Sequence, residues 1–342
     1  MTTYKEIRGK LIKKVTADPT PASDLSAYEG EIWYNSTIGA LKVAEPIASV
    51  WSTAANSSSP ATGGMVGFGT QSAAVLAGGT IPVPAPANID PIVTVQEYDG
   101  TSWSTVNSMS QKRSVFGAAG PQTASAVYGG RISGNPATYT ANTEEYDGTN
   151  WTGGGAMGAT RYYMGAAGTQ TAAFAIGGLQ GGPTSKTDTQ IYDGSSWTAA
   201  PSLPTGIHAG RGSGTTSATL VASAAPPAPR DISMEYNGSS WSTGNPTGNT
   251  NQAYRGVSSL GTQTSSLLWG GEPFSGRTEH YDGTNWSTEA ATLGLARSGT
   301  GGGGTGTTGL AISGESPAGT PANNATEEFT ASFIGARTVT TS

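Results

Sequence analysis

Short apolar runs separated by turn residues cover most of the chain, and the stretch that ends at Trp197 shows this pattern most clearly. Residues 162–167 and 171–176 are two largely apolar runs joined by Gly-Thr-Gln, and residues 187–192 alternate polar with apolar side chains. Runs of this length are typical of β-strands, and glycine-containing connections are typical of tight turns. An Asp-Gly turn follows, so we expect Trp197 to begin a fourth strand.

The same pattern recurs with a period of 44 to 48 residues. Its marker is the block Tyr-(Asp/Asn)-Gly-(Thr/Ser)-x-Trp, whose tryptophans are Trp103, Trp151, Trp197, Trp241 and Trp286. Phe329 and Phe333 keep the aromatic character of this block in a sixth unit, although they are one residue closer together than the Tyr and Trp. Four antiparallel strands in such a repeat are typical of one blade of a β-propeller. The sequence therefore predicts an all-β, six-bladed β-propeller with units ending near residues 103, 151, 197, 241, 286 and 333.

The two ends of the chain lie outside this repeat. We expect residues 51–342 to form the propeller, with Trp51 in a strand that closes the ring by pairing with the last blade. Residues 1–50 form a short N-terminal extension in which 31–35 and 40–43 make a hairpin. This extension either packs on the propeller or serves as a docking arm. In the second case the contact residues would be Lys5, Arg8, Lys10, Lys13, Lys14, Trp33 and Tyr34.

Composition and charge narrow the functions to be considered. The net charge is −6, which disfavours binding to the phosphates of nucleic acid. Cysteine is absent, so disulfides, thiolate metal sites and cysteine nucleophiles are excluded. No apolar stretch approaches the roughly 18–20 residues of a membrane helix, so we expect no membrane insertion. We also expect no signal peptide, because the basic start is not followed by an apolar segment.

Charged residues that could carry chemistry recur in register with the repeat. Arginines precede the first strand and glutamates precede the aromatic residue of the third strand, and we expect them to pair between neighbouring repeats. They are Arg113, Arg161, Arg255 and Arg297, and Glu97, Glu145, Glu235 and Glu328. Catalysis needs a convergent set that breaks the repeat, and His208 and His280 lack partners at metal-ligand spacing. We therefore expect no catalytic residues, no metal site and no cofactor.

The connections differ in how much they vary. The turns between first and second strands and between third and fourth strands are nearly constant, whereas the step from the Gly-Gly pair to the Tyr varies from 10 to 19 residues. Alternate connections of an antiparallel sheet leave at opposite ends, so the variable loops share one face with the links between repeats. Neutral drift explains such variation without function. If this face binds a partner, the contact residues would be Ile81, Arg131, Tyr139, Lys186, Arg230, Phe274 and Arg277.

The motifs also resemble a known family. A Gly-Gly pair followed by Tyr and then Trp, as at 129–130 with 146–151, resembles the kelch β-propeller family. The amino-acid sequences of residues 143–151 and 168–178 resemble kelch-like repeats in virion and tail proteins of marine phages, including cyanophages. Residues 30–43 resemble a short element of phage structural proteins.

This resemblance implies a non-enzymatic phage virion protein, a component of the tail or a tail fibre that is present in multiple copies. The propeller would act in virion assembly, host-surface recognition or both. The N-terminal arm would contact other virion proteins, and the propeller would contact a host cell-surface glycan or receptor. One alternative is a secreted or surface carbohydrate-binding propeller of bacterial origin, which would be extracellular. A second is a glycan-cleaving enzyme on the same fold.

Overall fold

The computed structural model describes residues 12–16, 30–84, 89–222, 224–225, 231–247, 258–271, 274–317 and 324–338. These residues are all-β and contain no helix. Consequently, no helix in the described ranges has the length and apolar character needed to span a membrane. The chain divides into two compact units, one formed by residues 1–50 with 331–342 and the other by residues 51–330.

The first unit contains one four-stranded sheet with the order β1-β2-β3-β30. Its strands are β1 (Lys13–Val15), β2 (Ile32–Asn35), β3 (Ala40–Ile47) and β30 (Phe333–Thr338). β2 and β3 form the expected hairpin, in which Asn35 lies opposite Ala40. β1 runs parallel to β2, and β30 runs antiparallel to β3. Residues 331–338 therefore fold with the N-terminal segment.

The second unit contains six four-stranded sheets, which we number 1 to 6 in the order of their first strands. The strands of sheets 1 to 3 are β5 (Val66–Thr70), β6 (Ala73–Ala77), β9 (Val95–Tyr98) and β10 (Trp103–Val106); β11 (Gly117–Ala119), β12 (Ser125–Tyr128), β13 (Thr143–Tyr146) and β14 (Trp151–Gly154); and β15 (Gly165–Thr169), β16 (Ala172–Ile176), β17 (Thr189–Tyr192) and β18 (Trp197–Ala200).

The remaining sheets continue the series. Their strands are β19 (Arg211–Thr215), β20 (Ala218–Ala222), β21 (Ser233–Tyr236) and β22 (Trp241–Thr243); β23 (Ser258–Thr262), β24 (Ser265–Trp269), β25 (Thr278–Tyr281) and β26 (Trp286–Thr288); and β27 (Gly301–Gly304), β28 (Thr308–Ile312), β29 (Thr326–Thr330) and β4 (Val50–Ala54). A short pair, β7 (Thr80–Pro82) with β8 (Ile89–Pro91), extends the connection between β6 and β9.

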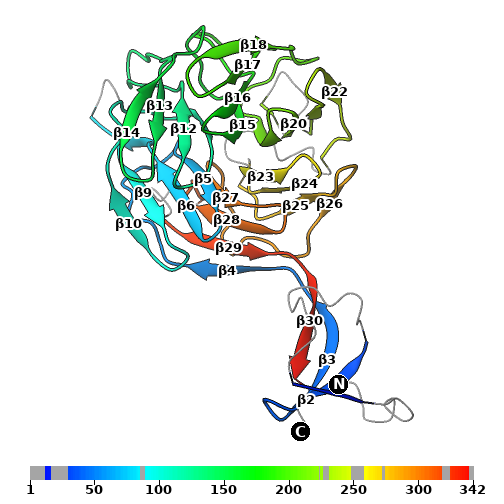
Figure 1. The fold of residues 1–342 in the computed structure, drawn as a ribbon. Coiled ribbons are helices and arrows are strands. Elements are labelled where there is room, and N and C mark those ends of the chain that lie inside the picture. Colours follow the sequence, from blue (N-terminus) through cyan, green and yellow to red (C-terminus); the bar gives the residue numbers. More distant parts are fainter. Residues whose placement is uncertain are drawn as a thin grey trace. The chain divides into compact units, whose positions relative to one another are not determined.

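The first strands of the six sheets contact one another in a closed cycle. Each of β5, β11, β15, β19 and β23 contacts the first strand of the following sheet, and β27 contacts β5. Figure 1 shows these sheets around a common centre. No individual sheet closes on itself. The arrangement is consistent with a propeller-like fold.

Sheet 6 is assembled from both ends of the second unit. Its outermost strand is β4, which is hydrogen-bonded to β29 and carries Trp51. Trp51 packs against Trp269 and Phe329, and its Nε1 donates to Thr278 Oγ1 at 2.7 Å. This pairing of Trp51 with the last sheet agrees with the sequence expectation. Phe333 was expected in this fourth-strand place, but it begins β30 because β4 occupies the edge of β29.

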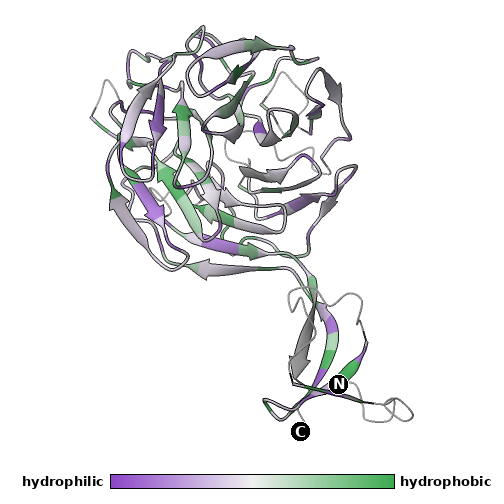
Figure 2. Cartoon of the chain, viewed as in Figure 1, coloured by the Kyte–Doolittle hydropathy of each residue, from purple (hydrophilic) through white to green (hydrophobic). Residues whose placement is uncertain are grey.

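The core of the second unit lies between neighbouring sheets. The second strand of each sheet is almost wholly buried, as in β16, because it is covered on both faces. Figure 2 shows the contrast between hydrophobic β6 and β12 and the more polar β9. In sheet 2, Tyr146 stacks on Trp151 with ring centroids 4.7 Å apart, and the same Tyr–Trp contact recurs in sheets 1, 3, 4 and 5. These large rings fill the space beside small Ala and Gly residues.

Repeated hydrogen bonds connect each sheet to its neighbour. The glutamine of the Gly-x-Gln turn donates to two carbonyls of the preceding sheet, as Gln170 does to Ser125 and Tyr146 at 3.2 and 2.9 Å. The tyrosine of the third strand donates to a glutamate of the preceding sheet, as Tyr192 does to Glu145 at 2.6 Å. The residues that are constant from repeat to repeat therefore hold neighbouring sheets together.

The expected pairing of Arg and Glu between repeats is wrong. Each arginine instead binds an acid of its own sheet: Arg113 contacts Glu144 at 3.1 Å, Arg161 contacts Asp188 at 3.0 Å, and Arg297 contacts Glu327 at 2.7 Å. Glu145, adjacent to Glu144, accepts instead from Tyr192 of the next sheet. Neighbouring residues of a strand face opposite sides, so the shift by one residue changes the partner. Arg255 lies outside the described residues.

Candidate functional site

A row of residues in left-handed backbone conformation borders the centre of the second unit. Each of them stands two residues before the first strand of its sheet. They are Gly64, Val115, Tyr163, Ala209 and Gly299, with φ values of 65°, 50°, 52°, 56° and 68°. The amide of Val115 donates to Gly64 O at 2.8 Å, that of Tyr163 to Val115 O at 2.9 Å, and that of Ala209 to Tyr163 O at 2.6 Å. The left-handed residues of sheets 1 to 4 are thus linked to one another by a series of backbone hydrogen bonds.

This backbone conformation is unfavourable for two of these side chains. Left-handed φ values suit glycine, whereas a β-branched or bulky residue there is an outlier that costs about 1–3 kcal/mol. Val115 and Tyr163 carry this cost. The turn at Tyr163 also explains why β15 starts at Gly165, although the apolar run predicted a strand from residue 162.

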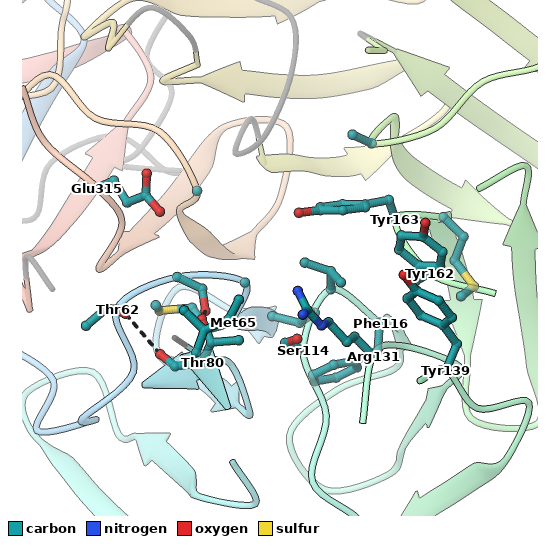
Figure 3. A pocket seen from close by; sticks show the side chains of 18 of the residues that line it. Thr62, Met65, Thr80, Ser114, Phe116, Arg131, Tyr139, Tyr162, Tyr163 and Glu315 are labelled. Carbon is teal, nitrogen blue, oxygen red and sulfur yellow. Dashed lines mark hydrogen bonds between the residues drawn. The ribbon is translucent and has the colours of Figure 1, made fainter. Parts of the chain in front are cut away.

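A pocket of about 240 Å³ lies beside this row. Its lining comes from the links before the first strands and from the loops after the second strands, and it includes residues of sheets 1, 2, 3, 4 and 6. The volume is close to the lower end of the roughly 300–1,000 Å³ range of small-molecule sites. Figure 3 shows the pocket with side chains converging from different sheets.

Three tyrosines form one wall of the pocket (Figure 3). Tyr139 and Tyr162 are stacked, with ring centroids 4.0 Å apart and an interplanar angle of 9°. Tyr163 packs against Tyr162 at a centroid distance of 5.6 Å. Burial, together with the neighbouring Tyr139, raises the pKa of the Tyr162 hydroxyl above its ordinary value. Tyr162 is therefore neutral at pH 7 and remains a hydrogen-bond donor.

The charged side chains of the pocket are Arg131, Arg211 and Glu315. Arg131 Nε donates to Ser133 O at 2.8 Å, and its Nη2 donates to Gly134 O. Figure 3 shows Glu315 across the pocket from the tyrosine wall. Burial lowers the pKa of Arg211 to about 10, with Tyr163 acting in the opposite direction, so Arg211 is a cation at pH 7. The arrangement suits a small polar ligand with an anionic group.

The structure brings together two of the contact residues expected from the variable loops. Arg131 and Tyr139 line the pocket, and their backbones are joined by an isolated β-bridge. Ile81, Lys186, Phe274 and Arg277 do not line it. Ile81 and Lys186 are half-buried, Phe274 is exposed, and Arg277 donates to Thr288 Oγ1 at 2.7 Å. Arg230 lies outside the described residues.

The residues expected in a docking arm differ in their solvent exposure. Tyr34 is 38% exposed and Lys14 is exposed, whereas Trp33 is only 3% exposed. Trp33 is therefore a buried residue and not a surface anchor. Lys13 belongs to β1, and Lys5, Arg8 and Lys10 lie outside the described residues.

Sequence reasoning missed Arg211, Tyr162 and Tyr163. A signal for Arg211 was present, because the fourth repeat departs from the others twice. Ile207 stands four residues before β19, where sheets 2, 3 and 6 have the buried arginine, and Arg211 stands inside the strand. The convergence of the tyrosines had no local signal, since Tyr139 and Tyr162 belong to different repeats.

Among the described residues, no group of three or more His, Asp and Glu side chains is arranged to hold a metal ion. No protein-family model matches the chain, and no curated protein sequence is significantly similar to it.

Proposed function

We propose that this chain is a non-enzymatic structural and binding protein, built as a six-bladed kelch-like β-propeller with an N-terminal docking segment. The propeller interpretation is supported by six four-stranded sheets, by the cyclic contacts of their first strands and by the 44–48-residue repeat. The completion of sheet 6 by β4 supports it further, because β4 supplies the tryptophan that the sixth repeat lacks.

The observation that carries the binding role is the pocket. It lies among the variable connections and gathers side chains that do not recur from sheet to sheet, namely Arg131, Tyr139, Tyr163 and Arg211. Recurring residues such as Asp147 and Trp151 are explained by the repeated fold, whereas these four are not part of the repeat. Aromatic and arginine side chains are the types that supply most of the binding energy in recognition sites.

The proposed setting is a phage virion, with the protein in the tail or a tail fibre in multiple copies. The propeller would serve in assembly or bind a host-surface glycan or receptor, and the N-terminal segment would attach it to other virion proteins. Support for this setting comes from the resemblance of 143–151 and 168–178 to virion repeats. Exposed Tyr34 and Lys14 are the described residues that fit an attachment surface.

Two measurements test the proposal. Mass spectrometry of purified particles from the source of the gene should detect the protein in multiple copies, and its absence would reject the virion setting. Excess purified protein should compete with particle adsorption to host cells. A Tyr139→Ala variant should compete less, whereas Lys186→Ala, outside the pocket, should compete like the parent. Equal competition by both variants would contradict the recognition role of the pocket.

A further inference from the structure

We infer that the pocket binds an acidic sugar unit, and that the Arg211 guanidinium is the group that binds its carboxylate. The inference rests on the proposed recognition role and assigns a ligand class to it. Its evidence is the state of Arg211, the position of this residue in the repeat and the kind of side chains around it.

The half-buried Arg211 guanidinium differs from the buried arginines that recur before the first strands. Arg113, Arg161 and Arg297 each bind a carboxylate and two carbonyl oxygens of their own sheet. The Nε of Arg211 is buried without a hydrogen-bond partner, as are those of Arg161 and Arg297. Unlike theirs, its terminal nitrogens form no hydrogen bond or ion pair with any described residue. Arg211 is half-buried at the pocket, where partial burial makes an unpaired cation less favourable than a paired one. A carboxylate matches the planar guanidinium with two parallel hydrogen bonds, so an anionic ligand would supply the partner that the described residues do not.

The fold itself does not require an arginine at this position. Arg211 lies opposite the last residue of the second strand, Ala222. The residues with the same register in the other sheets are Val66, Gly117, Gly165, Ser258 and Gly301. Three of the five are glycine, so the first strand is built there without a side chain. Arg211 therefore departs from the repeat without forming a hydrogen bond or ion pair that would stabilise the fold.

The surroundings select a sugar over a bare anion. Tyr163 presents an aromatic ring to the pocket despite its unfavourable left-handed backbone. Tyrosine hydroxyls donate and accept hydrogen bonds, as sugar hydroxyls do, and aromatic faces suit the C–H face of a sugar ring. Glu315 on the opposite side accepts hydrogen bonds from hydroxyls and disfavours a doubly charged phosphate. A singly charged ligand with several hydroxyls meets all of these groups.

The test is calorimetric titration of the full-length protein with glucuronate, galacturonate and N-acetylneuraminate, with glucose, galactose and inorganic phosphate as comparisons. At least one acidic sugar should bind at least 10-fold more tightly than the neutral sugars and phosphate. Arg211→Gly, which installs the residue of sheets 2, 3 and 6, should weaken that binding at least 10-fold. Arg211→Lys should weaken it several-fold, because the charge remains but the paired hydrogen bonds are lost. Arg277→Ala, an arginine outside the pocket, should bind like the parent.

A second variant guards against a folding defect. Tyr163→Gly installs the residue found at 64 and 299, so the backbone turn is kept while the ring is removed. This variant should bind the acidic sugar at least several-fold more weakly than the parent. Its circular dichroism spectrum should match that of the parent. Binding unaffected by Arg211→Gly, equal binding of glucose and glucuronate, tighter binding of phosphate, or no binding of any acidic sugar would each overturn the inference. Detection of the protein in particles is independent of these results, so the virion proposal and this inference fail separately.

Discussion

Replacing Trp51 by Ala is expected to destabilise the second unit as strongly as a core truncation, although Trp51 lies far from sheet 6 in sequence. Its ring centroid lies 5.4 Å from that of Trp269 and 5.3 Å from that of Phe329. Such aromatic pairs contribute about 0.5–1.5 kcal/mol each beyond burial. The 2.7 Å hydrogen bond from Nε1 to Thr278 Oγ1 adds about 0.5–1.5 kcal/mol. With the lost burial, the total falls within the roughly 3–5 kcal/mol typical of large aromatic-to-Ala changes.

The assay is urea unfolding of the full chain, followed by far-UV circular dichroism and by tryptophan fluorescence. Trp51→Ala should lower the free energy of unfolding by about 3–5 kcal/mol, and Trp51→Phe by only about 1 kcal/mol because it keeps the ring contacts. Trp103→Ala, at the equivalent place in sheet 1, should resemble Trp51→Ala. Tyr34→Ala, an exposed position in the other unit, should change it by no more than about 0.5 kcal/mol. A Trp51→Ala variant within about 1 kcal/mol of the parent, beside a strongly destabilised Trp103→Ala, would refute the idea that β4 completes sheet 6.

Three further changes test the repeated contacts. Asp147→Asn should keep the turn, as Asn237 does in sheet 4, whereas Asp147→Ala should lower the melting temperature. Backbone N–H groups, that of Asn150 first, lower the pKa of Asp147, so its charged form stabilises the fold above about pH 4 and this contribution is lost as the pH falls further. Asp147→Asn should therefore lose less stability than the parent when the pH is lowered below about 4. Identical dependence of the melting temperature on pH in the two proteins would contradict this. Gln170→Ala should cost about 1–3 kcal/mol in chemical unfolding, because two carbonyls of sheet 2 lose their donor; a change below about 0.5 kcal/mol would show that this glutamine does not hold sheets 2 and 3 together. Val115→Gly should leave the melting temperature unchanged or raise it, since relief of about 1–3 kcal/mol of strain exceeds the roughly 0.5–1 kcal/mol entropic cost of glycine; a clearly lower melting temperature would oppose this assignment of strain.

The strands could be predicted from the sequence because their determinants are local and repeated. The turn at Asp193 and Gly194 illustrates this: the Asp193 carboxylate accepts from two amides within three residues, and Gly194 has a φ of 92°. Every sheet makes the same demand, so the same short block recurs. The structure confirms strands on either side of this turn, with β17 starting at Thr189, two residues after the predicted start, and β18 starting at Trp197.

The partners of the buried charges could not be predicted in the same way. Glu144 and Glu145 are adjacent in sequence, yet one binds Arg113 within its sheet and the other accepts from Tyr192 of the next sheet. The choice depends on which residue of β13 faces inward, and a register error of one residue reverses it. Likewise, Tyr163 belongs to an apolar run that favours a strand, and a backbone hydrogen bond to Val115 O in another sheet overrides this local preference.

The arginines near the centre of the second unit show how a repeat separates structural from functional positions. Where Arg113, Arg161 and Arg297 stand, the sheet supplies a carboxylate and carbonyl oxygens, so the charge is satisfied within the fold. Sheet 4 has Ile207 at that place and needs no such cation. Four residues further along, at the start of β19, it carries Arg211, which has no described partner. A half-buried charge that the fold neither requires nor pairs is free to bind a ligand, which is the role inferred for Arg211. Truncation of a repeated arginine is therefore expected to lower stability in any sheet, whereas truncation of Arg211 changes binding and leaves the fold intact.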